Sequence, residues 1–138
     1  MSKKWNNEFL QAYIRLEELC NEKFGLIKGG VSEYIRRLND LRFAEGGPET
    51  LRTLDYYRSV RNSMVHESDA VRRLNVTKKD VDAIRRFTND IKHKRDPLSR
   101  YLTRARRYRY RRRFLRGVLI LVAAHVVAAV VACLVCFL

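Results

Sequence analysis

Cysteine, proline and tryptophan are scarce in this chain of 138 residues, which has three cysteines, two prolines and one tryptophan. So few cysteines exclude a small secreted domain held together by disulfides. No stretch alternates apolar and polar residues long enough to predict a strand, so the sequence predicts an all-α protein. Phosphate-binding glycine loops and the H-E-x-x-H zinc motif are also missing, and we expect no cofactor and no metal site.

Acidic residues are missing from the C-terminal part of the chain. The formal net charge is +14, from 29 lysines and arginines against 15 aspartates and glutamates. All 15 acids lie in residues 1–96, whose net charge is +5, whereas the remainder contains nine arginines and no acid. The sequence therefore divides into a mixed-charge domain at 1–96, an arginine-rich helix at 97–116 and an uncharged segment at 117–138.

The segment 117–138 has no charged side chain, and His125 is its one polar interruption. At about 1.5 Å per residue this helix spans about 33 Å, which matches a hydrocarbon core of about 30 Å and predicts a single transmembrane helix. Because all nine arginines precede the span, the positive-inside rule predicts a cytoplasmic N-terminal domain and a C-terminus on the far side. The polar start at Met1–Asn7 predicts no secretory signal, so we expect a tail-anchored protein.

Apolar residues recur with helical spacing in four stretches of residues 1–96, which predicts a bundle of about four helices. Asp96-Pro97 is expected to start a fifth helix that continues into the span. The four expected helices are Lys4–Phe24, a helix capped by Ser32 with Leu41 on its apolar face, a helix opened by Pro48, and a helix opened by a capping box at Thr77–Asp80. Cys20 lies on the apolar face of the first and is expected to pack in the core.

The third of these helices carries an arginine among apolar residues. At about 100° per residue, Arg61 falls within the apolar arc, whereas His66 lies about 140° away on the polar face that also carries Asn62. An unpaired buried guanidinium is costly, so Arg61 either extends to solvent or has a functional partner. Arg61 and His66 can act together only if the helix ends or unwinds near Met64–His66, or if a second copy supplies one of them; otherwise His66 is a helix C-cap. The arc consists of Leu54, Tyr57, Val60, Met64 and Val65.

The segment Arg61-Asn62-Ser63-Met64-Val65-His66 resembles the R-N-x-x-x-H form of the Arg-x4–6-His motif of the HEPN superfamily (higher eukaryotes and prokaryotes nucleotide-binding domain). The similarity covers roughly residues 4–95, since the motif lies late in a helix and precedes a polar loop and an amphipathic helix at Thr77–Arg95. The resemblance implies a HEPN-like bundle that dimerises, so that two copies of the motif share one cleft. In active members this cleft is a metal-independent ribonuclease, whereas other members bind nucleotides or are structural modules.

The resemblance also implies a role for each site residue. His66 would act as general base on an RNA 2′-hydroxyl, Arg61 would hold the scissile phosphate, and Asn62 would orient the phosphate or His66, leaving a 2′,3′-cyclic phosphate. A guanidinium binds phosphate through paired hydrogen bonds, and a nearby cation favours the neutral imidazole that a base requires at pH 7. The resemblance also suggests a toxin or antiviral-defence effector that acts as a homodimer, with an inhibitory or regulatory protein partner. Together with the apolar span, it leads us to expect a location in a prokaryotic inner membrane.

The arginine-rich helix has two interpretations. Its side chains could bind anionic lipid headgroups, or they could bind the RNA backbone while the interleaved Tyr101, Tyr108 and Tyr110 stack on bases. Two alternatives to the enzyme remain open, namely a non-catalytic docking or oligomerisation module and a membrane-disrupting effector that acts through its span. The candidate lipid- or RNA-binding residues are Arg104, Arg106, Arg107, Arg109, Arg111, Arg112 and Arg113.

Overall fold

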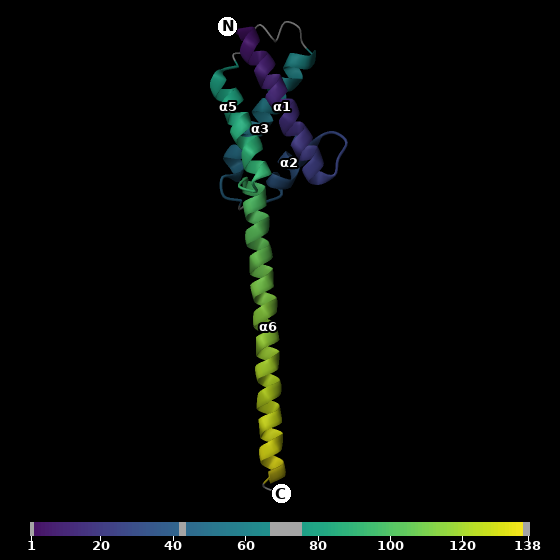
Figure 1. Ribbon diagram of the computed structural model, residues 1–138, viewed down its shortest axis with the longest axis vertical. Coiled ribbons are helices and arrows are strands. Elements are labelled where there is room, and N and C mark those ends of the chain that lie inside the picture. The colour runs from purple at the N-terminus through teal and green to yellow at the C-terminus, as the bar shows by residue number, and fades with distance from the viewer. Residues whose placement is uncertain (1, 42–43, 67–75, 137–138) are drawn as a thin grey trace. The chain divides into compact units, whose positions relative to one another are not determined.

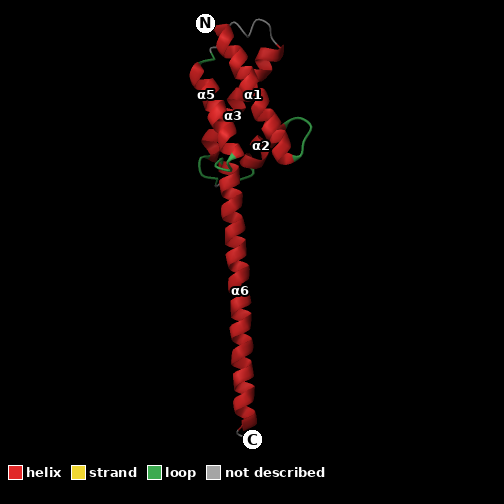
Figure 2. Cartoon of the chain, in the orientation of Figure 1, coloured by secondary structure: helices red, strands yellow, loops and turns green. Residues whose placement is uncertain are grey.

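The computed structural model describes residues 2–41, 44–66 and 76–136, and at Ser2, Lys3, His66 and Cys136 it describes the backbone only. The prediction of an all-α protein is confirmed for this part of the chain, because it contains helices and no strand (Figures 1 and 2). The polar loop expected after His66 falls on residues 67–75, outside the described residues. The helices are α1 (Ser2–Phe24), α2 (Gly30–Asn39), α3 (Gly47–His66), α5 (Lys78–Lys92) and α6 (Pro97–Cys136).

The chain forms two compact units, Met1–Tyr101 and Leu102–Leu138. The first unit is the helical bundle, and it includes the first turn of α6, because Leu98 is buried in the core and Tyr101 packs against it. In the second unit α6 continues without a break to Cys136, as the Asp96-Pro97 start predicts. Among the described helices, α6 alone is long and apolar enough to cross a membrane, and its apolar side chains are exposed.

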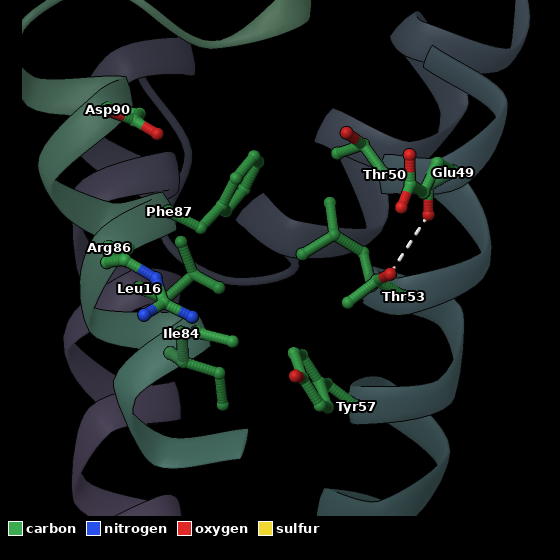
Figure 3. Close-up of a pocket in the computed structure, with 11 residues that line it drawn as sticks. Leu16, Glu49, Thr50, Thr53, Tyr57, Ile84, Arg86, Phe87 and Asp90 are labelled. Carbon is green, nitrogen blue, oxygen red and sulfur yellow. Dashed lines mark hydrogen bonds between the residues drawn. The ribbon is translucent and has the colours of Figure 1, made fainter. Parts of the chain in front are cut away.

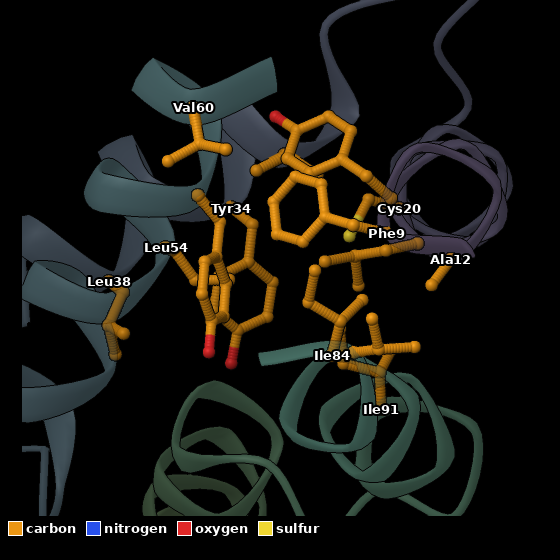
Figure 4. Close-up of a cluster of buried hydrophobic side chains, with 14 of the residues drawn as sticks. Phe9, Ala12, Cys20, Tyr34, Leu38, Leu54, Val60, Ile84 and Ile91 are labelled. Carbon is orange, nitrogen blue, oxygen red and sulfur yellow. The ribbon is translucent and has the colours of Figure 1, made fainter. Parts of the chain in front are cut away.

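The bundle is organised around α1. This helix packs against α2 and α5 and touches α3, while α2 also packs against α3. The face of α1 that enters the core has helical spacing, as predicted from the sequence, and Cys20 is 1% exposed within it (Figure 4). Burial raises the pKa of the Cys20 thiol to about 12, so the residue packs as an unreactive apolar group. The buried face of α1 comprises Phe9, Ala12, Tyr13, Leu16 and Cys20.

Two aromatic pairs connect the outer helices through the core. Phe9 of α1 meets Tyr57 of α3 edge-on, with 5.6 Å between ring centroids. Tyr34 of α2 meets Phe87 of α5 in the same way at 5.4 Å. Edge-to-face pairs add to the stability gained from burial, so these contacts hold α2 and α3 in register with α1 and α5.

The start of α2 differs from the prediction. Ser32 was expected to cap this helix, but α2 begins at Gly30 and Ser32 is an exposed residue within it. Side chains of α1 bind the first N–H groups instead: Gly30 donates to Asn21 Oδ1 at 2.8 Å and Val31 donates to Glu17 Oε2 at 3.1 Å. A Cβ atom at Gly30 would lie 2.4 Å from the backbone nitrogen of Asn21, so this close approach requires glycine. The predicted cap was wrong because the cap comes from another helix.

The end of α2 also differs slightly from the prediction. The helix ends at Asn39, so Leu41 packs against the core from the connecting segment and not from a helical face. The next helix, α3, begins at Gly47, one residue before the predicted Pro48.

The start of α5 is as predicted. Thr77 is the N-cap residue, and its backbone N–H and its hydroxyl donate to Asp80 Oδ2 at 2.9 and 2.7 Å. The bond from the Thr77 N–H and the reciprocal bond from the Asp80 N–H to the Thr77 side chain form a capping box, which satisfies two N–H groups at the helix end.

Replacing Thr77 with alanine is expected to reduce the free energy of unfolding by about 1 kcal/mol, the usual cost of losing an N-cap side chain. The measurement is urea unfolding of the full chain in detergent, followed by the fluorescence of Trp5, which is the only tryptophan and packs against the core. Thr53→Ala is the control, since the Thr53 hydroxyl only donates to the Glu49 carbonyl within α3 at 3.0 Å and alanine favours helix. Equal unfolding midpoints for both variants would contradict the role of the cap.

Candidate functional site

The helix that carries the candidate motif buries one face and exposes the other. Leu54, Tyr57 and Val60 of α3 are buried, and Met64 packs against the core. Val65 is 51% exposed, so its predicted place on the inward arc is wrong. At about 100° per residue Val65 lies at the edge of that arc, and it is the penultimate residue of the helix, so the core does not enclose it.

Arg61 is partly buried within this apolar face, and its Nη1 donates to Asn62 Oδ1 at 3.1 Å. Among the described residues no carboxylate pairs with Arg61, whereas Arg58, one turn earlier, pairs with Asp55 at 2.7 Å. Arg61 also lies close enough to α1 to act on Tyr13: burial raises the pKa of this phenol to about 12, and the charge of Arg61 opposes that rise. The guanidinium of Arg61 is therefore oriented by its hydrogen bond to Asn62, and no acidic side chain of the described part neutralises its charge.

His66 is the last residue of α3. The backbone is helical from Arg61 to His66, so the Cα atoms of these residues lie about 140° apart around the helix axis. The His66 side chain lies outside the described part of the chain. Of the three predicted site residues, the structure thus brings Arg61 and Asn62 together and places the backbone of His66 at the helix end. The motif does not unwind before His66, and this leaves an ending helix or a second copy as the ways to combine the two residues.

The arginines of α6 form a separate feature, which we call the arginine collar and define as the eight arginines from Arg104 to Arg116. All eight are exposed, and so are the interleaved Tyr108 and Tyr110, at 68% and 75%. Tyr101 differs from them, because it packs against the core and belongs to the bundle. The collar therefore contains two interleaved tyrosines where the sequence suggested three.

A buried polar cluster at the start of α6 was not predicted. The Asp96 side chain has no exposed surface, and it accepts hydrogen bonds from the Tyr34 hydroxyl at 2.7 Å and the Ser99 N–H at 3.1 Å. Lys23 Nζ lies 3.3 Å from both carboxylate oxygens and donates to Ser99 Oγ at 2.8 Å. The Ser99 N–H bond confirms Asp96 as the cap of α6. Lys23 and Tyr34 are 73 and 62 residues away in the sequence, so no local pattern could have identified them.

The Asp96 cluster joins α6 to α1 and α2 through charge as well as hydrogen bonds. Burial, and then the adjacent charge of Asp96, raise the pKa of Tyr34 well above its usual value, so the phenol remains a hydrogen-bond donor. The carboxylate is thus held by a lysine, a phenol and the backbone, which is the full set of partners that a buried charge requires.

A cavity of about 410 Å³ lies between α3 and α5, over Leu16 of α1 (Figure 3). Its lining includes the aromatic rings of Tyr57 and Phe87 and the exposed charged residues Glu49 and Arg86. Burial and the nearby carboxylate of Asp80 raise the pKa of Tyr57. Neither Arg61 nor Asn62 lines this cavity, so it is distinct from the part of α3 where their side chains lie.

Clusters of three or more histidine, cysteine, aspartate or glutamate side chains that could hold a metal ion do not occur among the described residues.

Comparison with known proteins relates the chain to one family. Neither the curated proteins nor the solved structures include a match to the chain. DUF6548, described as a family of unknown function, matches residues 7–116, which cover the helical bundle and the arginine collar and end directly before the uncharged segment. The matched stretch is well over half of the sequence, and the chain therefore belongs to DUF6548, a family of unknown function.

Proposed function

We propose that this protein is a membrane-anchored endoribonuclease of the HEPN type, which cleaves RNA without a metal ion and acts as a toxin or antiviral-defence effector. The observation that carries the proposal is the Arg61–Asn62 pair near the C-terminal end of α3, with His66 as the last residue of the same helix. The all-helical bundle, in which the motif helix packs beside α2 and precedes α5, is the setting that the resemblance requires.

Arg61 suits the role of a phosphate ligand. Its guanidinium donates one hydrogen bond to Asn62 and pairs with no carboxylate of the described residues, so further N–H groups remain for an anion. A planar guanidinium can donate two parallel bonds to a phosphodiester, and its charge stabilises the additional negative charge of the transition state. Asn62 is exposed beside it and fixes the orientation of the guanidinium.

His66 supplies the base in this mechanism. Its neutral imidazole takes the proton of an RNA 2′-hydroxyl, and the 2′-oxygen attacks the phosphorus held by Arg61. The bond from phosphorus to the 5′-oxygen then breaks, and the 5′-oxygen takes up a proton from water, which leaves a 2′,3′-cyclic phosphate on one fragment and a 5′-hydroxyl on the other. The cation of Arg61 favours the neutral form of a nearby imidazole, which is the form that the base requires.

A homodimer fits the motif better than a monomer does. Because α3 is helical through His66, Arg61 and His66 of one copy emerge from the helix about 140° apart. Two copies packed at the end of α3 would place Arg61 of one chain opposite His66 of the other and form one composite cleft. RNA is the substrate of that cleft, and an inhibitory or regulatory protein partner would restrain it.

The anchor is α6. Its uncharged part is long and apolar enough to cross a membrane, and the arginines directly before it favour a cytoplasmic position for the bundle by the positive-inside rule. The proposed location is the inner membrane of a prokaryote, with the C-terminus on the far side. In this arrangement the bundle meets cytoplasmic RNA.

The test is digestion of RNA by the full chain in detergent micelles with excess EDTA. The wild type is expected to release fragments with 2′,3′-cyclic phosphate ends, and His66→Ala is expected to cleave about 10²–10⁴-fold more slowly, the usual contribution of a general base. His93→Ala is the matched control, because His93 is an exposed histidine that caps α5 and lies outside the motif. If wild type and His66→Ala leave the RNA equally intact after any bound partner is stripped off, the enzyme proposal fails.

A further inference from the structure

The arginine collar surrounds α6 on every side. At about 100° per residue, the seven arginines from Arg106 to Arg116 leave no angular gap wider than about 100° around the helix axis. The two widest gaps, each about 100°, are those into which Tyr108 and Tyr110 project. All of these side chains are exposed, and no acidic residue follows Asp96 in the sequence. The collar is thus a closed ring of positive charge with an aromatic side chain in each of its two widest gaps.

The position of the collar relative to the apolar segment is equally specific. Arg116 is followed directly by Gly117, where the uncharged run begins. The eleven residues from Arg106 to Arg116 extend about 15 Å along the helix, and the polar layer on each side of a bilayer is about 5–7 Å thick. Arg111–Arg116 therefore falls at the depth of the headgroups when the apolar segment spans the hydrocarbon. The earlier arginines lie within about one Debye length of that surface.

We propose that the collar binds the phosphates of anionic phospholipids around the whole circumference of α6; this rests on the membrane anchorage proposed above. A helix that crosses a bilayer is surrounded by headgroups on all sides. The arginines at headgroup depth therefore meet phosphates directly, and the earlier arginines, which complete the ring, are attracted to the same phosphates from within about one Debye length. An RNA strand or a folded protein covers one side of a helix and would leave the opposite arginines unpaired. The distribution of charge therefore favours lipid as the partner of the collar over the RNA alternative.

Tyr108 and Tyr110 fit the same partner. A tyrosine at a membrane interface places its ring against the lipid and its hydroxyl in water, and aromatic residues are enriched at that depth. Both tyrosines are exposed on a helix that has no neighbouring element in its own unit, so their rings have no protein surface to pack on there. Tyr110 and Tyr108 lie about 1.5 and 4.5 Å beyond Arg111 along the helix, so their rings project into the gaps between the arginines at the outer edge of the headgroup layer.

The experiment measures the lipids next to the span in the full chain. Leu119→Trp places a tryptophan at the start of the apolar segment, and the chain is reconstituted in vesicles of phosphatidylcholine with phosphatidylglycerol, in which one lipid at a time carries acyl-chain bromine. Quenching of the fluorescence of the tryptophan at position 119 then reports the fraction of each lipid next to the span. The chain without this substitution gives the background fluorescence of Trp5. We expect the local fraction of phosphatidylglycerol to exceed the bulk fraction about two- to fourfold, and to approach it in 1 M salt.

Two variants identify the collar as the cause. Replacing Arg109, Arg111, Arg112, Arg113 and Arg116 with glutamine is expected to remove the enrichment. The matched control replaces five exposed basic residues of the bundle with glutamine and is expected to retain it. These are Arg15, Lys28, Lys78, Lys79 and Lys92.

Each other outcome overturns the proposal in a recognisable way. Equal quenching by the two brominated lipids refutes lipid binding by the collar and leaves the anchor intact. Absence of quenching by either lipid refutes the anchor and the collar together, while ribonuclease activity in micelles is unaffected by that result. Displacement of the enriched lipid by added RNA, with loss of RNA binding in the glutamine variant, assigns the collar to RNA.

Discussion

Replacing Asp96 with alanine is expected to reduce the free energy of unfolding of the bundle by about 3–5 kcal/mol, the usual cost of breaking a buried ion pair by removing one partner. The carboxylate has no exposed surface and accepts bonds from Tyr34 and Ser99 while it pairs with Lys23. Its removal leaves a buried phenol, a buried N–H and an ammonium without their acceptor. Since small domains are stable by about 5–15 kcal/mol in total, the variant loses a large fraction of its stability.

The fluorescence of Trp5 during urea unfolding of the full chain measures this loss. Asp90→Ala is the matched control: Asp90 pairs with Arg95 at 3.4 Å, but that pair is exposed to solvent and is expected to contribute less than about 1 kcal/mol. Tyr34→Phe removes the hydroxyl that donates to Asp96 and is expected to reduce the free energy of unfolding by about 1–2 kcal/mol. This variant should therefore remain folded even if Asp96→Ala does not. If the free energies of unfolding of Asp96→Ala and Asp90→Ala differ by less than about 1 kcal/mol, water replaces the lost carboxylate as a hydrogen-bond partner.

The second large effect is expected at Arg61. Replacing Arg61 with lysine should lower the rate of RNA cleavage about 100-fold with little change in stability, because an ammonium keeps the charge but cannot donate two parallel bonds to a phosphodiester. Arg58→Lys is the control: Arg58 lies one turn earlier on α3 and is already paired with Asp55 at 2.7 Å. Similar rates for both lysine variants would mean that Arg61 contributes only charge, and would remove the basis for its role as a phosphate ligand.

Mixing two inactive variants tests whether the cleft is shared between chains. Arg61→Ala and His66→Ala, co-refolded in equal amounts, form heterodimers in half of the pairs, and each heterodimer has one intact site when the two residues come from different chains. About a quarter of the wild-type activity is then expected to return. We expect this recovery because α3 is helical through His66, which separates the two residues by about 140° within one chain. An inactive mixture would instead place both residues of each site on the same chain.

The prediction of helix positions succeeded where the signal was local. The capping box at Thr77–Asp80 and the Asp96-Pro97 start were identified correctly, because the hydrogen bonds of a cap join residues that are neighbours in sequence. Ser32 failed as a cap because Asn21 and Glu17 of α1 bind the N-terminal N–H groups of α2 instead. Contacts of this kind depend on how two helices dock, and periodicity does not contain that information.

For the candidate site as well, the sequence predicted what depends on neighbouring residues and did not predict the contacts that depend on packing. Spacing alone placed Arg61 within the apolar arc of its helix and Asn62 on the polar face, and in the structure Arg61 is partly buried and Asn62 is exposed. The hydrogen bond between their side chains depends on rotamers. The effect of the Arg61 charge on the pKa of Tyr13 depends on the packing of α1 near α3. The role of the motif in RNA cleavage remains a proposal that the variants above test.

The sequence by itself determined that the chain is helical, that Arg116 is the last charged residue and that an apolar segment follows it. These features follow from composition and periodicity, which are properties of residues close together in the sequence. Only the tertiary structure decided that Asp96 is a buried charge. The sequence places it at a helix start, where such residues are commonly exposed, but Lys23 and Tyr34 converge on it from α1 and α2. A carboxylate can be buried only where donors surround it, and residues far apart in the sequence meet there only when the helices pack.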